Sequence, residues 1–521
     1  MNWKRPLALS TAALTLGTAL AACGNPTAAA PDPTPTPAAE VQSLSTTGST
    51  VKAPKYVFLF IGDGMSYPQI QSTSDFLGAL NDADYRQAPP SLDDDGGAIL
   101  DGPEYLNFMN FEAAGSAVTY DSNSFAPDSA STATSISTGY KTYSGSINVD
   151  ETGTISYETI AEQLHAQKGY SVGVITSVNL NHATPAAFYA HQASRNDYYD
   201  IGLELIDSGF EYFAGGGLLK PTGAEGDQAD LYALAEKAGY HVVKTQAEAE
   251  QVTGGPVVII DEHLADSDAM AYEIDRTDDM WALADYVEKG IEVLSQDKDG
   301  FFMMCEGGKI DWAGHANDAA TSIYDTIALS DAVQVALDFA AAHPGECLII
   351  VTADHETGGM TIGFATTAYD THFQYLQNQK TSFTAFDDVI SELKESGATF
   401  EDAMAKVEEL YGLTTKEGEA LSLTATDVES LRKAWNVAMG TQEIDKAEAS
   451  LLYGGYNPFS MAVSHIMNNK AGLSYTSYAH TGLQIPVYAY GVGAEKFSGL
   501  YDNTGIFTRT MDAMGLTPDA E

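Results

Sequence analysis

The sequence predicts an α/β protein, a three-layer α/β/α sandwich around a large, mainly parallel central sheet, with a helical insertion. Two observations support this prediction. Apolar runs recur without alternation, which is typical of strands buried on both faces and hence of a parallel sheet covered by helices. Between Gly359 and Ser477 the pattern changes to that of amphipathic helices, and a further apolar run then returns to the sheet.

The expected strands are five apolar runs that end in polar or glycine-rich junctions. They are KYVFLFIGDG (55–64), YSVGVITS (170–177), GFFMMCEGG (300–308), ECLIIVTADHETGG (346–359) and IPVYAYG (485–491). Residues able to do chemistry end or follow the first four runs: Asp63, the segment 179–184, Glu306, and Asp354 with His355. Ligands of such sheets bind beyond the carboxyl ends of the strands, so we expect these side chains to form one site.

Residues 361–476 are expected to form the helical insertion. Three stretches each begin with a threonine placed three positions before an acidic residue, as in a capping box, and end at a glycine: Thr384 to Gly397, Thr399 to Gly412 and Thr426 to Gly440. An independent C-terminal domain is the alternative. The strand expected at 485–491 argues against it, because the chain then returns to the sheet.

Composition excludes several classes of protein. The 521 residues include 25 Lys and Arg against 72 Asp and Glu, a net charge of −47, and 44% are hydrophobic. The apolar fraction excludes disorder, and the scarcity of basic residues excludes an extended nucleic-acid surface. Three cysteines are too few for a disulfide framework. The acidic excess is typical of a halophilic protein, since salt screens repulsion between carboxylates.

The N-terminus has the pattern of an export signal. Residues 1–23 combine Lys4-Arg5, an apolar run and small residues before Cys23, and Leu20-Ala21-Ala22-Cys23 resembles a bacterial lipobox. Residues 24–54 are rich in Pro, Thr, Ala and Ser and are expected to form a flexible tether. We expect an exported protein in the periplasm, outer membrane or cell surface, lipid-anchored through Cys23; simple secretion is the alternative.

Several residues have the types and spacing of a metal-assisted catalytic site. Ser129 follows a potential cap, Asp128, at the first turn of a small-residue helix, where unpaired N–H groups stabilise an alkoxide or a phosphate. Zinc favours nitrogen and oxygen ligands such as Asp311, His315, Asp354, His355 and His480. Magnesium accepts oxygen ligands, which Thr184 and Glu306 offer.

These residues lie in strings that resemble the alkaline phosphatase family. IGDGM, PDSASTAT, STGYKTYSG, NHATPAAFYAHQASR, CEGGKIDWAGH, VTADHETGG and AHTG occur in the family's order, from about residue 55 to 363 and again from about 478. The resemblance implies a metal-dependent hydrolase of small phosphate monoesters that uses two Zn²⁺ and one Mg²⁺ per subunit. Ser129 would be the nucleophile, forming phosphoserine, and Arg195 the phosphate clamp.

The resemblance also implies the ligand sets. Asp311, His315 and His480 would hold one zinc. Asp354, His355 and Asp63 would hold the other beside Ser129, and Asp63 would bridge to magnesium held by Thr184 and Glu306. His182 and Trp312 stand at two positions that vary in the family, and we expect both to contact the substrate. A neutral imidazole at His182 in place of a carboxylate leaves the affinity and identity of the third metal open.

Other features are expected to be structural. Cys305 and Cys347 are expected to be buried, unreactive thiols. Asp93, Asp94 and Asp95 are expected to be solvated carboxylates that bind no metal. Packing is expected for three histidines, His191, His372 and His465. The run GGPVVII (254–260) is expected to be a strand.

The sequence leaves two alternative functions open. The protein could be a phosphodiesterase or sulfatase of the same superfamily, or an acidic surface protein without enzymatic activity. The resemblance also leaves open whether the protein is a monomer or a homodimer.

Overall fold

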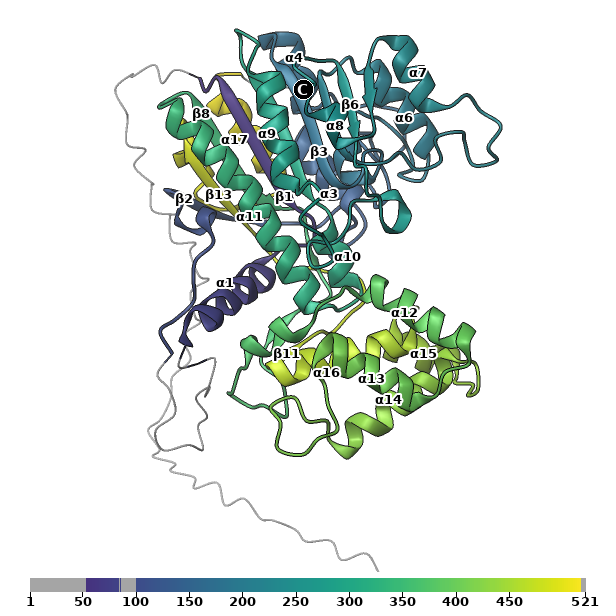
Figure 1. Cartoon of the computed structure of the whole chain (residues 1–521). Helices are drawn as coiled ribbons and strands as arrows, with labels where there is room; N and C mark the ends of the chain where they lie inside the picture. The colour runs from purple at the N-terminus through teal and green to yellow at the C-terminus, as the bar shows by residue number, and fades with distance from the viewer. Residues whose placement is uncertain (1–52, 84, 86–99, 517–521) are drawn as a thin grey trace, which may run out of the picture. The chain divides into compact units, whose positions relative to one another are not determined.

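The structure is a computed structural model that describes residues 53–83, 85 and 100–516 (Figure 1). The expected leader 1–23, nearly all of the tether and the acidic run at 93–95 lie outside the described residues, so those expectations stay predictions. Within the described part of the chain, no helix is both long enough and apolar enough to cross a membrane.

A ten-stranded sheet forms the centre of the fold and confirms the predicted α/β class. Its strand order is β14-β2-β13-β8-β1-β7-β3-β4-β6-β5. Every neighbouring pair is parallel except those of β13, which runs antiparallel to both β8 and β2. The strands are β1 (Tyr56–Gly62), β2 (Ala113–Val118), β3 (Ser171–Asn179), β4 (Tyr212–Gly216), β5 (His241–Val243), β6 (Val257–Ile260), β7 (Phe301–Gly307), β8 (Cys347–Ala353), β13 (Ile485–Gly491) and β14 (Gly499–Asp502). All five apolar runs and the run at 254–260 contain strands, as expected.

The central strands are buried on both faces. Every residue of β1, β7 and β8 is buried, which explains the continuous hydrophobicity of their sequences. Their register is level at the carboxyl edge, where Gly62 pairs with both Gly307 and Ala353. Residues that directly follow β1 and β8 therefore emerge at the same place.

Helices cover the two faces of the sheet (Figure 1). The helices α9 (Leu283–Leu294) and α11 (Ala319–Ala342) pack together on one face, and α3 (Ser129–Thr138), α4 (Ile160–Lys168), α5 (Ala183–Ala186) and α17 (Thr504–Ala513) lie on the other. Helix α9 packs on the sheet because it has an apolar face: Leu283, Val287 and Leu294 recur at helical spacing and are buried. The remaining elements outside the insertion are α1 (Tyr67–Asn81), α6 (Tyr198–Asp207), α7 (Leu231–Ala238), α8 (Gln246–Ala249), α10 (Lys309–His315), β9 (Glu356–Thr357), β12 (His480–Thr481), η1 (Asn107–Asn110), η2 (Asp266–Asp268) and η4 (Ala494–Phe497).

Five α-helices fill most of the segment 361–476. They are α12 (Phe383–Ser396), α13 (Phe400–Tyr411), α14 (Ala425–Ala438), α15 (Lys446–Tyr453) and α16 (Pro458–Ala471), preceded by η3 (Phe373–Asn378). The short strands β10 (Thr361–Ile362) and β11 (Leu473–Ser474) pair antiparallel at the base of the segment. Because its two ends meet, the segment leaves and rejoins the sheet-bearing part of the chain at one place.

Two of the three expected helix starts were wrong by two residues. Thr399 caps α13 as expected, but Ser382 caps α12 and Thr424 caps α14, in place of Thr384 and Thr426. Asp427 completes the capping box of Thr424, so the acidic residue three positions after Thr426 was not the partner. All three predicted stops, Gly397, Gly412 and Gly440, have the left-handed backbone typical of helix ends, and Gly440 directly follows the C-cap Met439 of α14.

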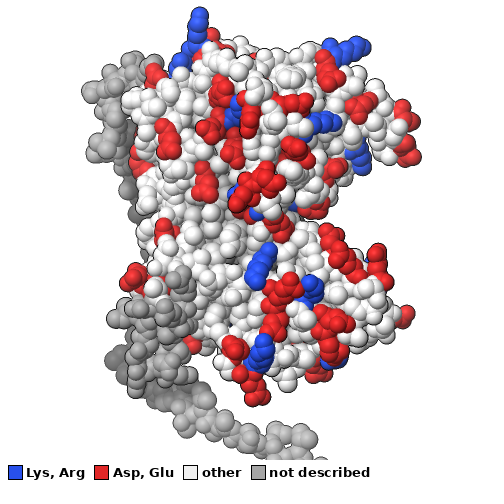
Figure 2. All heavy atoms as spheres, viewed as in Figure 1, with Lys and Arg blue, Asp and Glu red and all other residues white. Residues whose placement is uncertain are grey.

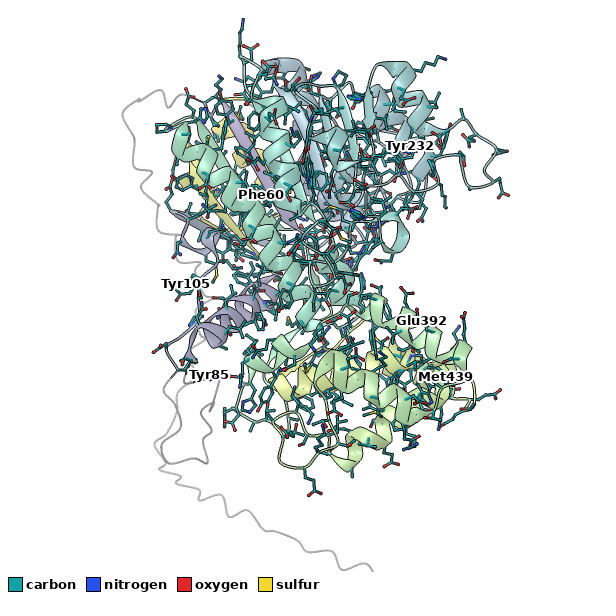
Figure 3. The ribbon with its side chains drawn as sticks, viewed as in Figure 1. Phe60, Tyr85, Tyr105, Tyr232, Glu392 and Met439 are labelled. Atoms are coloured by element: carbon teal, nitrogen blue, oxygen red, sulfur yellow. The ribbon has the colours of Figure 1, made fainter. Side chains whose placement is uncertain are left out.

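The insertion packs around a second apolar core, which it shares with two neighbouring helices. Phe459 of α16 is fully buried, and its ring centroid lies 5.2 Å from that of Trp435 and 6.1 Å from that of Phe386. The same core includes Phe76 of α1 and Ile323 of α11, so these helices bury apolar surface against those of the insertion. Figure 3 draws the side chains of both parts of the chain, with Phe60 labelled in β1 and Met439 after α14.

Candidate active site

Ser129 begins α3. The carboxylate of Asp128 accepts a hydrogen bond from the backbone N–H of Ser131 and so caps the helix. Small residues follow because α3 is fully buried and packs closely against its neighbours. Ser129 Oγ, itself almost fully buried, lies 3.1 Å from His355 Nε2. The hydroxyl thus combines a helix N-terminus with an imidazole nitrogen.

Arg195 is held in a fixed orientation by two side chains. Its Nη1 donates to Asp128 Oδ2 over 2.9 Å, and its Nη2 lies 3.3 Å from His182 Nε2. Burial lowers the pKa of His182 to about 3, with a contribution from the charge of Arg195, so the imidazole is neutral and Nε2 accepts from the guanidinium. The ring of Trp312 lies edge-on to His182 with centroids 6.0 Å apart. His182 and Trp312 therefore stand beside the predicted phosphate clamp.

His315, His480 and Asp311 form one group of potential metal ligands. His315 Nδ1 donates to the carbonyl of Tyr478 over 2.7 Å, and His480 Nδ1 donates to that of Pro127 over 2.6 Å. A carbonyl only accepts, so each Nδ1 carries a proton, and in the neutral tautomer the lone pair is on Nε2, on the opposite side of the ring. The two Nε2 atoms lie 3.1 Å apart, and each is 3.4 Å from an oxygen of Asp311. A cation relieves the repulsion between such lone pairs and carboxylate oxygens.

A second group of ligands surrounds His355. Its Nε2 lies 3.2 Å from Asp63 Oδ1 and 3.2 Å from Asp354 Oδ2. The hydroxyl of Thr357 donates a hydrogen bond to Asp311, and its oxygen lies 3.3 Å from His355 Nδ1. The hydroxyl oxygen therefore accepts a hydrogen bond from the Nδ1–H group, which leaves the lone pair of the ring on Nε2. The group whose ligand atoms all lie within 4.8 Å of one another contains Asp63, Asp311 and His355. Asp354 lies beside it through the contact with His355 Nε2.

Two predicted oxygen ligands, Thr184 and Glu306, lie beyond Asp63. Thr184 Oγ1, at the first turn of α5, donates to Asp63 Oδ2 over 3.2 Å. Glu306 ends β7 beside Thr176, which donates to Glu306 Oε2. Glu306 Oε1 and Asp63 Oδ1 are buried and find no hydrogen-bond donor among the described residues. Buried oxygens without donors are costly, and a hard cation compensates for them.

The electrostatics show that this site needs positive charge. Four carboxylates, those of Asp63, Glu306, Asp311 and Asp354, are each at most 4% exposed. Burial, with the neighbouring carboxylates, raises the pKa of Asp63 well above its usual value, that of Glu306 to about 8 and that of Asp354 to about 6. The charge of Arg195 is already paired with Asp128. The residues present therefore fit divalent cations in number, type and charge.

Sequence reasoning missed several supporting residues. Asp128 was expected only as a helix cap, yet it also holds Arg195. Thr357 and the carbonyls of Pro127 and Tyr478 fix the three histidine tautomers, and backbone carbonyls leave no signal in a sequence. A side chain with two partners in distant segments is identified only once those segments are brought together.

The residues expected to be structural lie outside the two ligand groups. Cys305 and Cys347 are buried, and burial raises the pKa of both thiols, Cys347 to about 12. His191 lies 3.4 Å from both Glu162 and Glu204. His372 and His465 belong to the insertion, at its start and in α16.

The comparisons with known proteins agree with this geometry. The family model for alkaline phosphatase matches residues 54–516, so the chain belongs to the alkaline phosphatase family. Alkaline phosphatase 3 of Bacillus subtilis is 30% identical over 468 residues, which are 88% of this chain and 89% of that protein. The chain is therefore an enzyme, a phosphomonoester hydrolase, as the resemblance implied.

Two solved structures are also similar. A cold-active alkaline phosphatase from Shewanella sp. superposes with a TM-score of 0.69 at 27% identity, over 88% of this chain and 99% of that chain. A variant of the TAB5 alkaline phosphatase, in which glutamate replaces a histidine, has Mg bound in its M3 site. That structure is 25% identical, has a TM-score of 0.59 and covers 90% of this chain and 99% of its own.

Proposed function

We propose that this enzyme is an exported, metal-dependent phosphomonoesterase that releases inorganic phosphate through a phosphoserine at Ser129. The observation that supports this most directly is the position of Ser129 Oγ, 3.1 Å from His355 Nε2 and at the start of α3. The hydroxyl faces the groups that would bind the metals, and the N-terminus of the helix favours the negative charge that develops on the oxygen.

The donor sets assign the cations. One Zn²⁺ would be held by Asp311, His315 and His480, the other by Asp63, Asp354 and His355 beside Ser129. Mg²⁺ would be held by Asp63, Thr184 and Glu306, and the Mg in the M3 site of the TAB5 variant supports a third metal in this family. Bound metals of this kind neutralise charge on the entering, leaving and non-bridging oxygens of phosphate.

The reaction follows from the residues. Ser129 Oγ bonds to phosphorus as the bond from phosphorus to the leaving alcohol breaks, and water then cleaves the phosphoserine to inorganic phosphate. Arg195 donates its remaining N–H groups to two non-bridging oxygens, while Asp128 and His182 prevent the guanidinium from turning. A monoester dianion carries two negative charges on three unesterified oxygens, whereas a diester carries one charge on two, so the cationic guanidinium binds the monoester more strongly. The clamp therefore favours monoesters.

The nucleophile is tested by replacing Ser129 with alanine. We expect no radiolabelled phosphoserine after acid quench with a ³²P-labelled aryl monoester, and a loss of about 10³-fold or more in kcat. Ser135→Ala is the matched control, because Ser135 lies in the same buried helix and, among the described residues, its hydroxyl bonds only to the carbonyl of Ser131. Label that persists in Ser129→Ala would refute the assignment.

Export and anchoring are also proposals. The Leu20-Ala21-Ala22-Cys23 motif and the following tether support a mature protein that begins at a lipidated Cys23 on the outer membrane or cell surface. Mass spectrometry of the native N-terminus tests this, with Cys23→Ser as the control that should stay unprocessed. An unmodified terminus elsewhere would refute the anchor. Sedimentation of the soluble domain distinguishes a monomer from a homodimer.

A further inference from the structure

The insertion contacts the segments that bear the zinc ligands His315 and His480 through a set of directed hydrogen bonds. Asn317 follows His315 by two residues, is 3% exposed and has a φ of 50°, a backbone conformation that non-glycine residues rarely adopt. From helix α16 of the insertion, Asn468 Nδ2 donates to the Asn317 carbonyl over 2.7 Å, and His465 Nε2 lies 3.2 Å from Asn317 Oδ1. The insertion thus holds the end of α10, where His315 lies.

Asn317 also joins this end of α10 to the segment that bears His480. Its Nδ2 donates to the carbonyl of Gly314 over 3.0 Å and to that of Ser477 over 2.8 Å. The donor and acceptor of one amide are therefore all in use, with helix α16 on one side and two ligand-bearing segments on the other. Asn317 thus links α16 to both ligand-bearing segments.

Tyr478 makes the second connection. Its carbonyl accepts the Nδ1 proton of His315, and its side-chain hydroxyl donates to the carbonyl of Leu452 in α15 over 2.6 Å. The ring packs so closely on Gly454 that a Cβ there would lie 2.3 Å from it. One residue thus fixes the tautomer of a ligand at its backbone and is anchored in the insertion by its side chain.

We infer that the helical insertion sets the zinc affinity of the Asp311, His315 and His480 group, with Tyr478 and Asn317 as positioning residues. This inference rests on the proposed role of that group as a zinc site. Without the insertion, Tyr478 and Asn317 keep the backbone contacts that neighbouring segments make with Gly358 and Gly314 but lose their anchors in α15 and α16. The acceptor that directs His315 Nε2 toward His480 is then held less precisely. Loss of such a supporting contact typically weakens metal binding by 10- to 100-fold.

The test uses the full chain loaded with Zn²⁺ and challenged with graded concentrations of a chelator. Tyr478→Phe removes the hydroxyl that anchors the residue, and Asn468→Leu removes the donor to Asn317. We expect each to release one zinc at about 10-fold lower chelator concentration than the wild type. Tyr411→Phe is the matched control, since the buried hydroxyl of Tyr411, also in the insertion, finds no hydrogen-bond partner in the described part of the chain.

A second readout separates positioning from a general loss of stability. A purely structural role lowers Tm equally with and without zinc, whereas a positioning role reduces the rise in Tm that zinc produces. Zinc retention equal to wild type in both Tyr478→Phe and Asn468→Leu would overturn the inference and leave the proposed function intact. A wild-type chain that holds no zinc would overturn both.

Discussion

The sheet edge and the insertion use their acidic residues in opposite ways. At the edge, four carboxylates are buried within one cluster, and two of their oxygens have no donor among the described residues. In the insertion, Asp402 and Asp427 complete capping boxes, and Glu408 and Glu409 pair with lysines at the surface. The edge is thus arranged to bind cations at a cost in stability, whereas the insertion is arranged for its own stability.

The prediction with the largest expected effect compares two fully buried phenylalanines, Phe60 of β1 and Phe459 of α16. Replacing either with alanine should cost about 3–5 kcal/mol of stability, because a large cavity remains. Their activities should differ. Phe60 lies three residues before Asp63, so Phe60→Ala should lower kcat at least about 10-fold. The kcat of Phe459→Ala should stay within about threefold of the wild-type value at saturating zinc.

Urea titrations and steady-state kinetics at a temperature where both variants are folded give these values. Equal losses of kcat at saturating zinc would show that the insertion acts directly on the chemistry and not only through metal affinity.

The second expectation concerns the clamp. Arg195→Ala should lower kcat/KM for an aryl monoester by about 30- to 1000-fold, since a charge-assisted bidentate contact contributes roughly 2–4 kcal/mol. An aryl diester should lose less, because it presents fewer unesterified oxygens. Kinetics with both substrates on wild type and variant provide the measurement. An equal loss for both would contradict the role given to Arg195.

The third expectation is a pH dependence of the metal-free protein. The folded pKa values of Asp354 and Glu306, about 6 and about 8, lie above their ordinary values. The native state then binds more protons than the unfolded state, so stability falls as pH rises from about 4 to 8, by about 1.4 kcal/mol per pH unit for each carboxyl within its window.

Metals replace those protons, so the zinc- and magnesium-loaded protein should lose less over the same range. Melting curves with and without chelator at pH 5, 6, 7 and 8 measure the difference in Tm between the metal-loaded and the metal-free protein. A difference that becomes smaller with rising pH would contradict the expectation.

The smallest expected effect is that of salt. Asp and Glu are spread over both the sheet-bearing part and the insertion on the face shown in Figure 2, with fewer Lys and Arg between them. Raising sodium chloride from 0.1 to 1 M shortens the Debye length from about 10 to about 3 Å. With metals saturated, Tm should rise by about 2–5 °C. An unchanged or lower Tm would show that the acidic excess does not limit stability.

Sequence alone determined the features that depend on local pattern. Continuous apolar runs identified the central strands because burial on both faces leaves no polar side, and the polar residues at their ends indicated one site because parallel strands share a carboxyl edge. In the insertion, Thr399 was identified as a cap. Thr384 was not a cap, because Ser382 caps α12 without an acidic residue three positions on, and Thr426 was not, because Thr424 has its own acidic partner in Asp427.

Only the tertiary structure decided the contacts between distant segments. Asp128 could be predicted as a cap, but its bond to Arg195 joins residues 67 positions apart. The carbonyls of Pro127 and Tyr478 fix the tautomers of His480 and His315, and every residue has a carbonyl, so no pattern marks them. Side-chain types limit which ligands a protein can offer; which lone pairs meet depends on how the fold places backbone groups that all sequences share.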